Sequence, residues 1–475
     1  MVFTLIKNSL KEVKIRPLFE ALCFWALISL IIIVAIETLL IPTDIVSRLF
    51  QISGLYGISS LFLIQVLGAN FTLASFLIFV VSVFTLYFVS LELARGSHLS
   101  SIMPGIPKLS QILLLYFILG SLLSIFIGLI DPQPEFLSNF RNILSLGLFF
   151  FLIKIINRDN EIKLSKIVLV VLFFVSIFSA LSFLVPPFAN WYSQYVVTHD
   201  KVTTFQSRMF SVSTGAWSIN AGTMALLLYS LALSRLLFVG ISLKWLVLCC
   251  LGAIGGLAFI GKFNVFAFFV ITLLFVITLL NQNKKYFSRF IILSVLTFSF
   301  IVTILIFKPG LFSDEIISFI QSYFSQGYLN VNRGELTGDL SSGRFGIWRL
   351  YALDSLKGFG MAPYGFGNVL DERKTAHNMI LHFAYHVGII PTIALVIAIG
   401  MLLHNTFKKS IQILDTSRGW RAIGYLFFFC GFLAQSMVST NWFVYKISFF
   451  GFLSLALAMG SVQKACSNYE LNSER

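Results

Sequence analysis

Charged residues are scarce in this chain of 475 residues: Asp, Glu, Lys and Arg make up 11% of it, whereas hydrophobic residues make up 57%. A soluble domain usually carries about a quarter charged residues. So little charge cannot cover the surface of a soluble protein of this size. Many separate apolar stretches reach the length of about 20 residues that a helix needs to cross the hydrocarbon core of a bilayer. Because these stretches are continuous rather than alternating in polarity, they predict membrane helices.

Cysteine is also scarce, and its five residues have neither the spacing of a metal site nor that of a disulfide framework. The sequence contains no Walker-type phosphate loop and no dinucleotide-binding fingerprint. It also lacks a carboxylate cluster typical of a nucleotide-sugar site. We therefore expect no metal site, no nucleotide cofactor and no cytoplasmic activity that uses nucleotides.

Twelve apolar stretches are candidate spans of a single all-α polytopic transmembrane domain over residues 1–475. The stretches are 20–41, 70–92, 109–130, 137–157, 165–185, 215–237, 241–260, 263–281, 289–307, 377–403, 420–438 and 442–462. The first is longer than the apolar core of a cleaved signal peptide, so it predicts a retained span.

The formal charge of +14 does not indicate a nucleic-acid partner, because the basic residues lie mostly in short connections between spans. That distribution sets the orientation of a membrane protein. With the N-terminus in the cytoplasm and twelve spans, 21 of the 34 Lys and Arg fall in cytoplasmic segments. Counting the apolar segment 47–67 as a thirteenth span would move the basic connection 154–166 to the other side. We therefore expect 47–67 to be a re-entrant or interfacial segment and both termini to be cytoplasmic.

The longest polar connection, 308–376, lies between spans 9 and 10 and is expected to face away from the cytoplasm. It carries seven basic and seven acidic residues, which favours a folded site over a basic patch. Ser341 or Ser342 can cap a helix that runs to about Lys357.

Two arginines of this helix are candidate ligands for phosphate. Arg344 and Trp348 are one turn apart on one face, so the indole can stack on the guanidinium, whereas Arg349 points elsewhere. A guanidinium donates two parallel hydrogen bonds and so suits phosphate and diphosphate groups. The alternative is a surface helix with solvated arginines.

His377 and Asn378 stand where this connection meets the next span. A histidine there can act as a general base near neutral pH, or it can be an interfacial or capping residue. His382 and His386 have the spacing of a metal-binding pair, but no third ligand is apparent in the sequence.

The other outward connections contain three further candidates. Lys262 lies in a very short turn, where it can line a cavity for an anionic group or extend toward water from the end of a span. Asn220 begins a span and can bind a ligand or pair with a neighbouring helix. Arg208 precedes Asn220 in the connection 186–214.

Taken in order, these segments resemble the O-antigen ligase and O-antigen polymerase superfamily. The resemblance rests on Ser342-Gly343-Arg344 with Trp348, on Gly358-Phe359-Gly360 and Gly365-Phe366-Gly367, and on His377-Asn378 with Leu381 and Gly388. Gly215 and Asn220 are similar to an upstream Gly…Asn segment of that family. The specific part covers residues 341–390, and the plan of twelve spans extends the similarity more loosely.

The resemblance implies a GT-C-like membrane glycosyltransferase of the bacterial inner membrane. Its donor would be a glycan on undecaprenyl diphosphate at the periplasmic face, used without a metal or nucleotide. Arg344 would hold the diphosphate leaving group, and His377 would deprotonate the acceptor hydroxyl. Lys262 stands where the family usually has the Arg of a Ser-Arg pair, so it keeps the charge but loses the two-pronged geometry. We assign Arg349 with these cations to the diphosphate, and Arg208, Asn220, Trp348 and Asn378 to the glycans.

The shared motif does not separate a polymerase, which transfers the chain onto a lipid-linked repeat unit, from a ligase, which transfers it to lipid A–core. The departure at Lys262 and the long connection favour the polymerase, for which a chain-length regulator protein is a candidate partner. A lipid-linked glycan flippase is the rival from another class. It would need polar residues lining the middle of the bundle.

Overall fold

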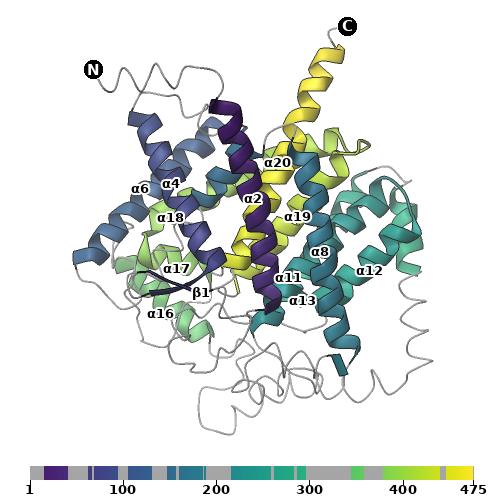
Figure 1. Ribbon diagram of the computed structural model, residues 1–475, viewed down its shortest axis with the longest axis horizontal. Helices are drawn as coiled ribbons and strands as arrows, with labels where there is room; N and C mark the ends of the chain where they lie inside the picture. The colour runs from purple at the N-terminus through teal and green to yellow at the C-terminus, as the bar shows by residue number, and fades with distance from the viewer. Residues whose placement is uncertain are drawn as a thin grey trace.

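The computed structural model describes residues 15–40, 63–66, 69–94, 105–130, 147–156, 160–185, 187–188, 216–257, 262–282, 286–295, 344–357, 378–438 and 445–473. These residues form a helical bundle with one short hairpin (Figure 1). The labelled helices are α2 (Ile15–Leu40), α4 (Leu73–Ala94), α6 (Lys108–Ile130), α8 (Asn160–Leu184), α11 (Ala216–Phe238), α12 (Leu243–Leu257), α13 (Lys262–Leu280), α16 (Arg344–Lys357), α17 (Met379–His386), α18 (Ile389–Gln412), α19 (Gly419–Ser436) and α20 (Tyr445–Ser473). Residues 147–155 and 286–295 are also helical.

Each of the twelve expected spans overlaps a described helix, although only the second half of 137–157 and the first part of 289–307 belong to the described residues. Among the described residues, three helical segments are long and apolar enough to cross a membrane: Asn160–Leu181, Asn220–Phe238 and Ile389–Gln412. Several shorter apolar helices surround them. These helices indicate a membrane-embedded protein, while the number of twelve spans stays a prediction.

The expected span 377–403 is broken into two helices. α17 ends at His386 and α18 begins at Ile389, with Gly388 between them at a φ of 115°. Glycine adopts this left-handed conformation without the steric penalty of a side chain. Hydropathy does not predict this break, because the apolar run continues across it. The backbone conformation at Gly388 shows it.

The start of the expected span 70–92 is wrong, because residues 69–72 form a strand, β2, before α4 begins. β2 (Ala69–Thr72) pairs antiparallel with β1 (Leu63–Val66), which ends the segment 47–67 that we expected to be re-entrant or interfacial. The two strands are rich in β-branched and aromatic residues, which favour extended backbone. The remainder of 47–67 lies outside the described residues.

The first turn of α4 is capped by Glu37, a fully buried carboxylate of α2. Its Oε1 accepts a hydrogen bond of 2.7 Å from the Ala74 backbone N–H. Helix N-termini carry unsatisfied N–H groups and a positive dipole end, so a carboxylate is favourable there. Glu37 thus has a structural role in joining α2 to α4.

The centre of the bundle is an antiparallel pair, α11 and α19. The Ser230 hydroxyl donates to the Gly424 carbonyl at 2.7 Å, and the Ser234 hydroxyl donates to the Trp420 carbonyl at 2.6 Å. The C-terminal half of α11 therefore lies beside the N-terminal half of α19. Polar side chains of this kind bond across membrane helices because no water is present to satisfy them.

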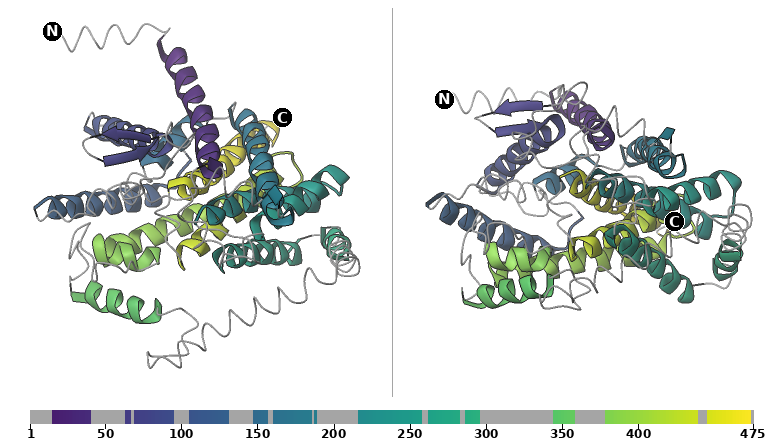
Figure 2. Two further views of the ribbon diagram at one scale, coloured as in Figure 1. Left: turned by 60° about the horizontal axis from the view of Figure 1, so that its bottom comes forward. Right: turned by 90° about the horizontal axis from the view of Figure 1, so that it is seen from below.

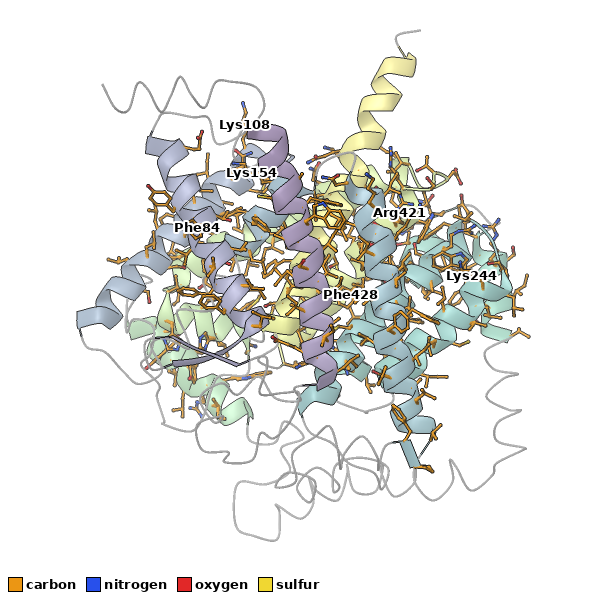
Figure 3. All side chains as sticks on the ribbon, viewed as in Figure 1. Phe84, Lys108, Lys154, Lys244, Arg421 and Phe428 are labelled. Carbon is orange, nitrogen blue, oxygen red and sulfur yellow. The ribbon has the colours of Figure 1, made fainter. Side chains whose placement is uncertain are left out.

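Several of the basic residues expected on the cytoplasmic side lie toward one end of the bundle. Lys108, Lys154 and Arg421 lie in the upper part of Figure 3, whereas Lys244 and Phe428 lie lower. At the same end of α11, the Arg289 guanidinium donates to the Leu237 carbonyl at 2.9 Å. We call this the basic end, and the side of the membrane that it faces stays a prediction.

Candidate functional site

The first group of expected site residues lies where α16 packs against α17. The rings of Tyr351 and Tyr385 are 4.9 Å apart between centroids, and Ile347 and Leu381 pack around them. Both tyrosines are buried. This aromatic contact joins the helix that begins at Arg344 to the helix that follows His377.

Asn378 is the N-cap of α17. Its Oδ1 accepts a hydrogen bond of 3.1 Å from the Leu381 backbone N–H. Its extended backbone and this bond are typical of a capping residue. Asn378 therefore fixes the start of α17, next to His377 in the chain, and its assignment to a glycan stays a prediction.

The structure describes the side chain of only one of the two arginines of α16. Arg349 is exposed and Trp348 is half-buried, so the two point to different sides of the helix, as the sequence predicts. Arg344 is the first residue of α16, and its side chain lies outside the described residues, as does all of His377. The structure therefore places the backbone of Arg344 but gives no distance from its guanidinium to the histidine.

The second group is a buried network of polar side chains from α11, α13 and α19. Asn264 Oδ1 accepts hydrogen bonds from Gln435 Nε2 at 2.8 Å and from the Thr223 hydroxyl at 3.0 Å. All three side chains are buried, and so is Asn220, one turn before Thr223 on α11. Asn220 therefore lies near the network that fixes the start of α13. Sequence reasoning missed Thr223, Asn264 and Gln435, although an intramembrane amide is a recognisable signal.

Lys262 is the first residue of α13 and precedes Asn264 by two positions. The network thus fixes the helical turn from which Lys262 extends, although the lysine side chain itself lies outside the described residues. Arg208 lies entirely outside them.

Both groups lie at the end of the bundle opposite the basic end. Gln435 is at the C-terminal end of α19, whereas Arg421 is in its first turn. α17 leads into α18, which runs back toward the start of α19. Laterally the groups are apart: Figure 2 shows α16 and α17 on one side of the bundle and α12 and α13 on the other. The structure therefore does not place α13, the helix that begins at Lys262, beside α16.

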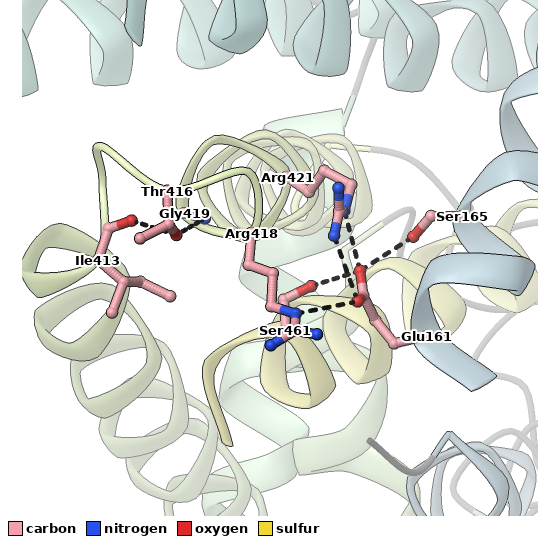
Figure 4. Close-up of polar contacts among 8 residues, drawn as sticks. All are labelled: Glu161, Ser165, Ile413, Thr416, Arg418, Gly419, Arg421 and Ser461. Atoms are coloured by element: carbon pink, nitrogen blue, oxygen red, sulfur yellow. Dashed lines mark hydrogen bonds and ion pairs between the residues drawn. The ribbon is translucent and has the colours of Figure 1, made fainter. Parts of the chain in front are cut away.

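A third polar cluster, which the sequence reasoning missed, lies at the basic end (Figure 4). Glu161 of α8 is 1% exposed, and its Oε1 accepts a hydrogen bond of 3.0 Å from Arg421 Nε. The same oxygen accepts bonds from the hydroxyls of Ser461 at 2.8 Å and Ser165 at 3.2 Å. Arg418 Nε lies 4.0 Å from Oε2. An acidic residue among the basic residues of the connection 154–166 was the available signal.

His382 and His386 lie in contact on the buried side of α17, with ring centroids 4.3 Å apart and ring planes tilted by 48°. The Ser124 hydroxyl of α6 donates to the His386 backbone carbonyl and anchors the end of this helix. Within the described part of the chain, no group of three or more His, Cys, Asp or Glu residues is placed to hold a metal ion.

Comparison of the sequence with models of protein families finds no match, and comparison with curated proteins finds no significant similarity.

Proposed function

We propose that the protein is a membrane glycosyltransferase acting as an O-antigen polymerase. It transfers a glycan from undecaprenyl diphosphate onto a lipid-linked repeat unit at the periplasmic face of the bacterial inner membrane. The observation that carries the proposal is the packing of α16 on α17 through Tyr351 and Tyr385, with ring centroids 4.9 Å apart. This contact couples the helix that starts at Arg344 to the helix that follows His377.

In the proposed reaction, a hydroxyl of the acceptor sugar attacks the anomeric carbon of the donor glycan. The bond from that carbon to the diphosphate oxygen breaks as the new glycosidic bond forms. His377 accepts the hydroxyl proton, and the diphosphate leaves with the bonding electron pair. Arg344 offsets the negative charge that develops on the leaving group, which lowers the barrier because the cation is already in place.

Arg349 and Lys262, the other cations assigned to the diphosphate, would bind further phosphate groups. Arg349 is exposed on α16 and can approach a second phosphate oxygen. The separation of α13 from α16 favours a different part of the substrate for Lys262 than for Arg344, such as the second of the two lipid-linked glycans. A polymerase needs two such sites, because donor and acceptor are both carried on diphosphate lipids.

The test is the replacement of Arg344 and His377 by alanine in a strain lacking the native protein. We expect each variant to insert normally and to lower glycan transfer by roughly 10²-fold or more, the usual effect of removing a charge-stabilising donor or a general base. Arg333→Ala in the same connection is the matched control and should retain transfer. Wild-type surface polysaccharide in both variants would contradict the proposal.

One gel of the deletion strain separates the polymerase from its alternatives. Loss of a polymerase leaves a single repeat unit on the lipid A–core. Loss of a ligase leaves bare core, with polymer still attached to the lipid carrier. Loss of a flippase strands intact lipid-linked repeats on the cytoplasmic leaflet.

A further inference from the structure

The helix α16 has a buried apolar side and a second row of apolar residues that is exposed. Ile347 and Tyr351 face α17, and Tyr351 is only 2% exposed. Leu350, Leu353 and Leu356 follow one another at intervals of three residues and are 56%, 50% and 65% exposed. Single exposed apolar residues are ordinary, but three on one side of a short helix form a continuous patch. We call these three leucines the outer face of α16.

The surroundings of α16 indicate what covers this face. Its neighbour α17 is held by α6 through the bond from Ser124 to His386 and leads directly into α18. The helices α6 and α18 also expose apolar side chains. The exposed residues are Leu119, Leu122 and Leu123 on α6 and Ile390, Ile393, Val396 and Ile397 on α18. In a membrane-embedded bundle, exposed apolar residues such as these face lipid, and α16 is joined to the two helices that carry them through α17.

The position of α16 is consistent with contact between its outer face and lipid. The helix lies at the edge of the bundle beside α17 rather than over the bundle centre (Figure 2). It packs along α17, from Leu381 near the start of that helix to Tyr385 near its end. Arg349 is exposed and lies one turn before Leu353. An arginine beside an apolar face can lay its stem along lipid chains while its charged group stays among the phosphates.

We propose that the outer face of α16 lies in the headgroup boundary of the bilayer, with Leu350, Leu353 and Leu356 in contact with lipid chains and Arg349 at the level of the lipid phosphates. This membrane contact does not depend on the glycosyl transfer proposed above. If that proposal also holds, a lipid-linked diphosphate, which lies at the same depth, reaches α16 sideways from the bilayer.

The test measures which medium surrounds a nitroxide label on this face. The full chain, with its five cysteines replaced by alanine, carries a single labelled Leu353→Cys or Leu356→Cys substitution. It is reconstituted in vesicles of phosphatidylethanolamine and phosphatidylglycerol. Collision rates are measured with oxygen, which concentrates in lipid, and with a water-soluble nickel chelate. Ile393→Cys on α18 gives the lipid reference, and Ser417→Cys, exposed between α18 and α19, gives the aqueous reference.

We expect the ratio of oxygen to nickel collisions at 353 and 356 to be severalfold higher than at 417 and close to that at 393. A ratio equal to that at 417 would show that the face is in water. Low collision rates with both reagents would show that protein covers the face, either another part of this chain or a partner such as a chain-length regulator. Either outcome overturns the proposal, and the second labelled site decides the question if the first variant does not fold.

Discussion

Replacing Glu161 by alanine removes the carboxylate that joins α8, α19 and α20 at the basic end. The side chain is 1% exposed and pairs with Arg421 at 3.0 Å, while Arg418 lies 4.0 Å away. The two guanidiniums are only 11% and 17% exposed, so without Glu161 they would face each other with little water around them. Removing one partner of a buried ion pair destabilises a protein by about 3 to 5 kcal/mol. We expect a loss of that size for Glu161→Ala.

The assay is unfolding of the purified protein in lipid nanodiscs, followed by intrinsic tryptophan fluorescence. Lys163→Ala is the matched control, because Lys163 is an exposed charged residue in the same turn of α8. A surface substitution of this kind changes stability by about 0.5 kcal/mol or less. The combined variant Glu161→Met with Arg421→Met should recover part of the loss, because it leaves one fewer unpaired buried charge. If Glu161→Ala is as mild as Lys163→Ala, the reasoning fails.

Three further predictions concern the opposite end of the bundle. Tyr351→Ala should release α16 from α17 at a loss of about 3 to 5 kcal/mol; faster proteolysis within 344–357 and lower glycan transfer would show it, and unchanged proteolysis would contradict it. Gln435→Leu should remove the hydrogen bond from Gln435 Nε2 to Asn264 Oδ1 while the bond from Thr223 remains, and it should lower stability in the unfolding assay by about 0.5 to 1.5 kcal/mol; an unchanged midpoint would contradict the network. Gly222→Ala would place a methyl 2.3 Å from Asn264 Nδ2 and should destabilise by about 1 to 3 kcal/mol. Gly400→Ala meets nothing within 4 Å and should be neutral or stabilising in the same unfolding assay.

The helical positions could be predicted because the spacing of apolar residues is a local property of the chain. A membrane helix satisfies its own backbone groups, so a continuous apolar run of sufficient length is enough to specify it. The starts of α11, α13 and α19 fall within a residue or so of the expected spans 215–237, 263–281 and 420–438. The hairpin of β1 and β2 and the break at Gly388 were not predicted, because an apolar run has the same hydropathy in either conformation.

The sequence predicted which segments of the chain form the candidate site, but not how their side chains are arranged. The order of Arg344, Trp348, His377 and Asn378 in the chain suggested one site, and the packing of α16 on α17 supports that grouping. The sequence could not show that Asn378 is a helix cap. It could not show either that Asn220 lies near a network with Asn264, because Gln435, the third member, is 171 residues farther along the chain.

The scarcity of charge in the sequence indicates a membrane-embedded protein, because too few polar residues are left to cover a soluble surface. The apolar runs also predict where the helices lie, and the composition shows which connection is polar enough to carry chemistry. Only the tertiary structure decided which polar side chains meet: Glu161 with Arg421 at one end, and Thr223, Asn264 and Gln435 at the other. Buried polar groups need partners, but several helices offer them, and the packing of the helices selects which partners come within hydrogen-bonding distance.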